Sequence, residues 1–216
     1  GRKKRYSAFQ WDHRRFTGTD WDERTKTSGV FRVAGKQWDT AVDRENVNYD
    51  YLMGANVDIR SPEVFEELVR WGVWYARETG VDGFRLDAVK HINFPFFARW
   101  LKAVREQTGK RLPAVGEYWT GDVEVALRYL EQIDRAASLF DVPLHQRMYQ
   151  ASRSGGQYDM GALLNDTLAT RVPELAVTFV DNHDTQPDQA LFSYVDNWFR
   201  PLAYALILLM EQGTPC

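Results

Sequence analysis

The chain has 216 residues, of which 44% are hydrophobic, and this is enough for one ordinary domain with an apolar core. The formal net charge is -3 and the only dense basic run is residues 2–5, so the sequence offers no basic stripe that could follow a phosphate backbone. We therefore expect no nucleic-acid partner.

The single cysteine, Cys216, excludes an internal disulfide framework. The longest apolar stretch, residues 198–210, contains Arg200 and Pro201 and is too short to cross about 30 Å of hydrocarbon. We expect no membrane partner, and no signal peptide is recognisable, so the compartment, secreted or cytoplasmic, stays open. Both ends interrupt a pattern, and we expect a fragment of a longer protein that is not functional alone.

Residues 1–60 are rich in Trp, Asp, Gly and Thr and show no sustained apolar period, which predicts a loop-rich segment with short strands. A helix is predicted from residue 61 to residue 80. Ser61 and Pro62 are typical of a helix start, and Gly80 is typical of a C-terminal cap.

Beyond residue 80, strand-like runs alternate with helical patterns. The strand-like runs are 81–88, 112–119, 138–144 and 175–181, and the helical patterns that follow them are 96–109, 123–133, 158–169 and 198–210. Such alternation predicts parallel βα units, which occur in a (β/α)8 barrel and in a doubly wound open sheet. No Gly-rich phosphate loop follows a strand, which argues against a doubly wound nucleotide-binding protein.

Three acidic residues stand at the ends of strand-like runs: Asp87, Glu117 and, just after its run, Asp184. One acid in such a place is usually a helix cap or a loop charge. In a parallel barrel, however, the carboxyl ends of the strands meet at one face, so the three carboxylates would converge. Arg85 lies two residues before Asp87, on the same face of the strand, and can hold that carboxylate ionised.

Three motifs carry a family resemblance: residues 83–91 (GFRLDAVKH), 116–119 (GEYW) and 179–184 (FVDNHD). They resemble the second, third and fourth conserved regions of glycoside hydrolase family 13. Residues 48–53, 139–144 and 198–205 further resemble the liquefying and intracellular α-amylases of that family. The likeness covers nearly the whole chain in order.

The resemblance implies a retaining reaction with Asp87 as nucleophile, Glu117 as general acid and base, and Asp184 as a carboxylate that stabilises the transition state. Such chemistry needs one ionised and one protonated carboxyl group about 5 Å apart, so Glu117 must have a raised pKa. His183 resembles a ligand of the sugar at the cleavage site. The alternative for His183 is a purely structural hydrogen bond.

Lys90 and His91 resemble residues that contact the leaving-group sugars. Their alternative is a solvated helix start. Trp119 lies two residues after Glu117 and is a candidate for stacking on a sugar ring. Most aromatic residues at helical spacing are instead expected in the core.

Calcium is the cofactor that the resemblance implies, with Asp50, Asn56 and the backbone carbonyl of His91 as ligands. The sequence departs from the family pattern at three positions, where Thr17, Asn56 and Arg60 replace acids. We therefore expect one calcium and no multi-metal cluster. The alternative is that the acids only decorate loops.

The predicted fold is a partial (β/α)8 TIM barrel, strands four to seven, formed by residues 61–216 and preceded by part of an inserted loop-rich B domain at 1–60. The predicted reaction is endo-hydrolysis of α-1,4-glucosidic bonds in an α-glucan such as starch, by an enzyme that is monomeric at full length. Two alternatives remain, namely another family 13 α-glucosidase or transglycosylase and a non-catalytic carbohydrate-binding homologue.

Overall fold

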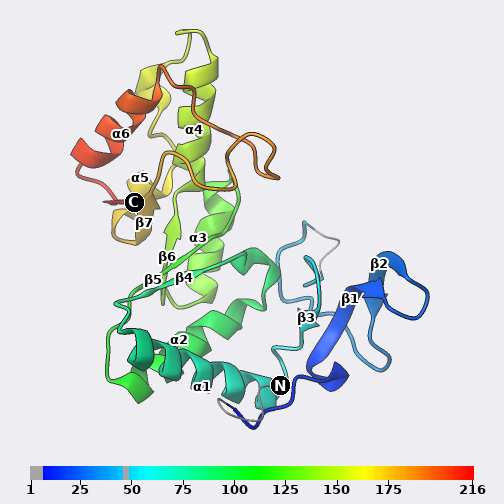
Figure 1. The fold of residues 1–216 in the computed structure, drawn as a ribbon. Helices are drawn as coiled ribbons and strands as arrows, with labels where there is room; N and C mark the ends of the chain where they lie inside the picture. The colour runs from blue at the N-terminus through cyan, green and yellow to red at the C-terminus, as the bar shows by residue number, and fades with distance from the viewer. Residues whose placement is uncertain (1–6, 46–48) are drawn as a thin grey trace. The chain divides into compact units, whose positions relative to one another are not determined.

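The computed structural model describes residues 7–45 and 49–216 (Figure 1). The basic run at residues 2–5 and Asn48 lie outside the described residues. The chain divides into two compact units: described residues up to 83 together with 89–112 form the first, and 84–88 with 113–216 form the second. These units group the two helices after residue 60 with the loop-rich segment. The domain boundary after residue 60 stays a prediction.

A small antiparallel sheet builds the first part of the first unit. Its strands are β1 (Phe16–Asp22), β2 (Thr27–Arg32) and β3 (Asn56–Val57), in the order β2-β1-β3. Gly18 in β1 allows the ring of Trp38 to lie against the backbone, since a Cβ atom there would collide with that ring. The short strands and long loops confirm the prediction for this segment.

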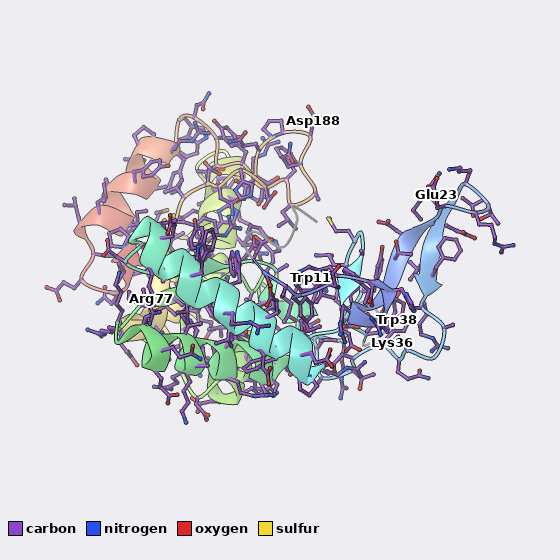
Figure 2. The ribbon with its side chains drawn as sticks, turned by 60° about the horizontal axis from the view of Figure 1, so that its bottom comes forward. Trp11, Glu23, Lys36, Trp38, Arg77 and Asp188 are labelled. Carbon is purple, nitrogen blue, oxygen red and sulfur yellow. The ribbon has the colours of Figure 1, made fainter. Side chains whose placement is uncertain are left out.

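Two helices complete the first unit: α1 (Pro62–Thr79) and α2 (Phe94–Thr108), which lie side by side in Figure 2. Gly72 lets them approach, because a Cβ atom there would stand only 2.5 Å from the Trp100 ring. The indole N–H of Trp100 donates to the carbonyl of Leu68 at 2.9 Å. Both helices end on glycines with positive φ, Gly80 and Gly109, as predicted.

The second unit contains a five-stranded sheet whose neighbouring strands all pair in parallel. Its order is β4-β5-β6-β7-β8, and the strands are β4 (Phe84–Leu86), β5 (Ala114–Gly116), β6 (Ser138–Phe140), β7 (Ala176–Thr178) and β8 (Thr214–Pro215). Chain order equals spatial order, as in a barrel, so the partial-barrel prediction is confirmed. Strand β8 is one strand more than predicted.

The helices of the second unit are α3 (Val123–Gln132), α4 (Val142–Arg153), α5 (Leu168–Arg171) and α6 (Arg200–Leu209). Helix α4 differs from the prediction, which places its first turn in the strand-like run 138–144. The single long helix predicted for 158–169 is wrong. That range contains a 3-10 turn, Met160–Ala162, and only the beginning of α5.

The core of the second unit forms where α4 and α6 pack against the segment that follows β7. Its buried members are Leu144, Met148, Ala151, Leu163, Val180, Val195, Phe199, Ala203 and Ile207. Among the described residues, no helix is both long and apolar enough to cross a membrane.

Candidate active site

Arg85, in β4, joins two of the three predicted carboxylates. Its Nη2 atom lies 3.1 Å from Oδ1 of Asp87 and 3.2 Å from Oε2 of Glu117. The parallel register places Arg85 beside Val115 of β5, and the backbone N–H of Glu117 donates to the carbonyl of Leu86 at 2.8 Å. The ends of two adjacent strands thus hold both carboxylates on one guanidinium.

The two carboxylates differ in their surroundings. The Asp87 side chain is 79% exposed, whereas that of Glu117 is 8% exposed. Burial raises the pKa of Glu117 and the negative charge of Asp87 raises it further, while the Ala88 N–H, at 3.3 Å from Oε2, and Arg85 act in the opposite direction. Ala88 adopts a φ of 45°, which is uncommon for a residue other than glycine.

Glu117 keeps one oxygen without a partner. Oε1 is buried, and no hydrogen bond reaches it from any described residue. A carboxyl group with a raised pKa and one uncommitted oxygen is suited to carry a proton for a ligand.

Asp184 lies in the segment that follows β7, at the same edge of the sheet. Oδ2 of Asp184 is 3.1 Å from Nε2 of His183, whose side chain is 63% exposed. The side-chain oxygen of Asn182 accepts the backbone N–H groups of Asp184 and Thr185, at 2.9 and 3.0 Å, and so fixes a turn. All three predicted carboxylates therefore follow strands of one parallel sheet.

Trp119 is half-buried two residues beyond Glu117. Its ring centroid lies 5.6 Å from that of His145 and 6.2 Å from that of Phe179. Two aromatic rings therefore pack near the indole.

Lys90 and His91 belong to the first unit, in a 3-10 turn, Val89–His91. Lys90 Nζ lies 2.5 Å, and His91 Nε2 3.6 Å, from Oε2 of Glu45. Burial lowers the pKa of His91, and the Lys90 side chain is only 12% exposed. The alternative of a solvated helix start does not describe these two side chains.

The Asp50 carboxylate is buried, and no cationic side chain pairs with it among the described residues. Oδ1 accepts the backbone N–H of Asp39 and Oδ2 accepts Nδ2 of Asn56, both at 2.9 Å. Burial raises the pKa of Asp50, and the nearby charge of Asp39 adds to this. A buried carboxylate without a counter-charge is a position that a cation would stabilise.

The neighbouring acids already have cations from the chain. Arg60 Nε lies 3.8 Å from Asp39 and 3.5 Å from Asp58, and Lys36 Nζ lies 2.8 Å from Asp58. Within residues 7–45 and 49–216, no three His, Cys, Asp or Glu side chains converge as a metal-binding group.

The sequence profile of the α-amylase catalytic domain matches residues 3–216. The chain belongs to the α-amylase family. It is 56% identical to an α-amylase of Geobacillus stearothermophilus, 53% to one of Bacillus licheniformis and 45% to the cytoplasmic α-amylase of Escherichia coli. These alignments cover 100%, 100% and 99% of the chain but 40%, 42% and 44% of the relatives, so the chain spans about two-fifths of their length.

Solved α-amylases share the fold. The Geobacillus thermoleovorans α-amylase complexed with acarbose superposes with a TM-score of 0.61 at 25% identity, over 76% of this chain and 38% of that one. An Anoxybacillus α-amylase gives a TM-score of 0.59 at 26% identity, over 76% and 36%. Both comparisons agree with a piece of an α-amylase barrel.

Two features near the site escaped the sequence analysis. Asp141 directly follows β6, but its carboxylate is completely buried and accepts three backbone N–H groups, those of Leu144, Leu168 and Ala169. This acid therefore caps the first turns of α4 and α5. The second feature is His145, which is buried in α4 with both ring nitrogens bonded. A buried histidine in an unpredicted helix leaves no recognisable sequence signal.

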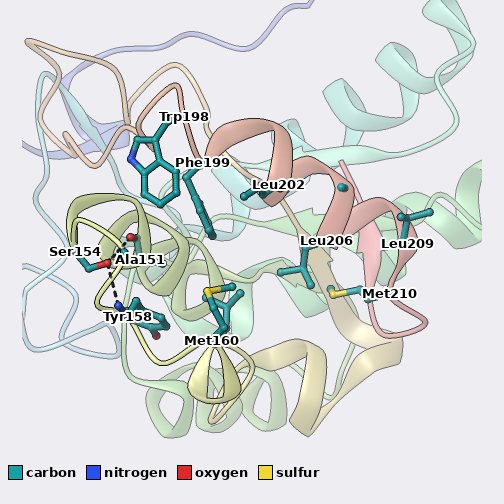
Figure 3. A pocket seen from close by; sticks show the side chains of 13 residues that line it. Ala151, Ser154, Tyr158, Met160, Trp198, Phe199, Leu202, Leu206, Leu209 and Met210 are labelled. Atoms are coloured by element: carbon teal, nitrogen blue, oxygen red, sulfur yellow. Dashed lines mark hydrogen bonds between the residues drawn. The ribbon is translucent and has the colours of Figure 1, made fainter.

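An apolar groove of the second unit is separate from the carboxylates. It has a volume of about 690 Å³ and lies between α6, the end of α4 and the 3-10 turn after it (Figure 3). Trp198, Leu202, Leu206 and Met160 are among its lining residues, and no carboxylate lines it. This apolar groove therefore lacks the groups that the α-amylase reaction needs.

Proposed function

We propose that the protein carrying this chain catalyses endo-hydrolysis of α-1,4-glucosidic bonds in starch-type glucans with retention of configuration. The observation that supports this most directly is the arrangement around Arg85, where an exposed carboxylate and a buried one share a single cation. A retaining glycosidase needs two carboxyl groups close together in different protonation states. Membership of the α-amylase family supports the same reaction.

In the proposed mechanism, Asp87 attacks the anomeric carbon, and the bond from that carbon to the glycosidic oxygen breaks. Glu117 gives its proton to the departing oxygen, so the leaving sugar departs with a neutral hydroxyl group. Ionised Glu117 then takes a proton from water, whose oxygen attacks the same carbon and releases Asp87. The raised pKa of Glu117 suits the first step, because it favours the protonated form.

Arg85 serves both carboxylates. Its guanidinium pairs with Asp87, and its positive charge stabilises Glu117 after it has lost its proton. We assign Asp184 to bind sugar hydroxyls and to stabilise the positive charge that develops on the sugar. His183, Lys90 and His91 are assigned to contact sugar hydroxyls.

Trp119 is assigned to stack on a sugar ring, since its aromatic neighbours hold the indole in place.

The same proposal includes the domain boundary, with a B domain at residues 1–60 and the barrel at residues 61–216. It also includes a monomeric full-length enzyme.

One calcium ion completes the proposal. Asp50, the amide oxygen of Asn56 and the carbonyl of His91 would hold it, and the ion would supply the positive charge that buried Asp50 lacks. Asp39 links these segments, because its N–H donates to Asp50 and its Oδ2 accepts Nδ2 of Asn93 at 2.8 Å. The ion pairs of Arg60 and Lys36 with the other acids support a single site rather than a cluster.

Analysis of products from soluble starch tests the reaction. We expect short oligosaccharides early in the digestion, with the α configuration at the new reducing end by NMR. Products with the β configuration would contradict retention. Cyclic products would favour a transglycosylase, which matters because a cyclomaltodextrin glucanotransferase is 30% identical over 64% of the chain. Binding of starch without any cleavage would favour a non-catalytic homologue.

A further inference from the structure

His145 uses both nitrogens of a completely buried ring to hold the segment after β7. It lies in α4 with no exposed surface. Nδ1 is 2.6 Å from the carbonyl oxygen of Val180, and Nε2 is 2.8 Å from Oγ of Ser193. One side chain thus bonds the beginning of this segment and a point 13 residues further along it.

The ring also contacts the aromatic group beside the proposed active site. It stacks on Phe179, with centroids 4.9 Å apart and planes 13° apart, and its centroid lies 5.6 Å from that of Trp119. His145 therefore touches residues that follow both β5 and β7.

Packing alone does not account for a histidine at this position. Burying a polar ring costs free energy unless both nitrogens are hydrogen-bonded, and an apolar side chain would fill the space without that cost. Burial lowers the pKa of His145, which favours the neutral ring. A carbonyl oxygen only accepts, so the proton is on Nδ1, and Nε2 accepts from the Ser193 hydroxyl when that group turns away from the carbonyl of Leu191.

The contact with Ser193 continues to the third carboxylate. The backbone N–H of Ser193 donates to the carbonyl of Thr185 at 3.0 Å. Thr185 is completely buried, and Asn182 accepts its N–H together with that of Asp184. A short series of hydrogen bonds thus connects His145 to the turn that presents Asp184.

We propose that His145 is a positioning residue, which fixes the segment after β7 through Val180 and Ser193 and thereby holds Asp184 in place for the reaction. This inference rests on the proposed function, because it takes Asp184 as a group that acts on the substrate. His145 itself does not touch the reacting atoms in this role.

A double-mutant cycle in the full-length enzyme tests the proposal, with soluble starch as substrate. The single variants are His145→Phe, which keeps a flat ring but removes both nitrogens, and Asp184→Asn. We expect His145→Phe to lower kcat about 100-fold, with a much smaller change in KM, since small displacements of an active-site group are costly in rate. In the Asp184→Asn background, His145→Phe should change kcat by less than about threefold, because the group that it positions is already lost.

Two further variants separate positioning from general stability. Met148→Ala also alters a buried residue of α4, but Met148 belongs to the apolar core, so it should lower the melting temperature without the loss in kcat. Ser193→Ala removes one hydrogen bond of His145 and should lower kcat less than His145→Phe does. In the Asp184→Asn background, Ser193→Ala should likewise have little further effect on kcat. It keeps the test valid if His145→Phe fails to fold.

Losses that multiply in the double variant would overturn the positioning role, and so would an unchanged kcat in both His145→Phe and Ser193→Ala. If Asp184→Asn alone keeps nearly full kcat, the assignment of Asp184 in the proposed function fails. The positioning role of His145 is then overturned with it. If Asp184→Asn does lower kcat, but the losses in kcat multiply in the double variant, only the inference about His145 is overturned.

Discussion

Arg85 contacts Glu117 from the neighbouring strand, with 3.2 Å between Nη2 and Oε2, and yet burial keeps the pKa of this carboxyl group raised. Desolvation therefore outweighs the nearby cation. The balance allows Glu117 to be protonated before the reaction while the product of proton transfer, its carboxylate, still has a partner.

The first prediction concerns activity. Glu117→Gln in the full-length enzyme should lower kcat on starch by about 10³-fold, because proton donation is lost while the shape of the side chain is kept. Binding of starch, measured by affinity electrophoresis, should stay within about threefold of the original. A fall in kcat of less than about tenfold would exclude Glu117 as the general acid.

The second prediction concerns stability and uses the same variant. Because the pKa of Glu117 is raised in the folded state from its ordinary value of 4.5, the folded protein holds this proton more tightly than the unfolded chain does. The associated stability is fully present below pH 4.5 and is lost as pH rises through the folded-state pKa. Gln does not ionise, so Glu117→Gln should melt at a higher temperature than the original protein at pH 8.

The difference in melting temperature should shrink towards pH 4, which calorimetry at several pH values can measure. As a control, Glu106→Gln changes an exposed carboxylate in α2 and should give no such trend. A difference that stays constant across this pH range would contradict the raised pKa of Glu117.

The alternating pattern predicted the parallel sheet because βα units leave a strong signal. Short apolar runs mark β4 to β7, and glycine caps mark the ends of α1 and α2. Strand β8 is missing from the prediction because it has only two residues, Thr214 and Pro215, and contains no apolar run.

Helix α4 was missed for a different reason. Residues 138–144 read as one apolar run, but Asp141 caps a helix there, and Pro143 lies in its first turn. The predicted helix at 158–169 fails because the range contains Gly161 and, at Asp166, a residue with φ of 47°. Such a conformation depends on the surrounding structure and cannot be read from the periodicity.

The residue types of the site could be predicted, but its electrostatics could not. The sequence placed Arg85 beside Asp87, since both belong to one strand-like run. The contact of Arg85 with Glu117 depends on the register between β4 and β5, which pairs Arg85 with Val115. The burial that raises the pKa of Glu117 likewise comes from packing around β5.

The third prediction concerns Asp141, the acid that sequence reasoning passed over. Asp141→Ala would leave three buried backbone N–H groups without their acceptor, and we expect a loss of about 3 kcal/mol in the free energy of unfolding. Urea unfolding of the full-length enzyme measures this loss. Asp159→Ala is the matched control, because Asp159 caps an exposed 3-10 turn and should cost well under about 1 kcal/mol.

The last prediction concerns calcium. Removal of calcium by a chelator should lower the melting temperature of the full-length enzyme, because an ion that binds only the folded state stabilises it by mass action. Asp50→Asn removes the buried negative charge that attracts the ion, so this variant should melt at the same temperature with and without chelator. Asp58→Asn is the matched control. Asp58 is already paired with Lys36, so its replacement should leave the response to chelator intact. An unchanged melting curve of the original enzyme in excess chelator would show that the replacements at Thr17, Asn56 and Arg60 have removed the requirement for a metal.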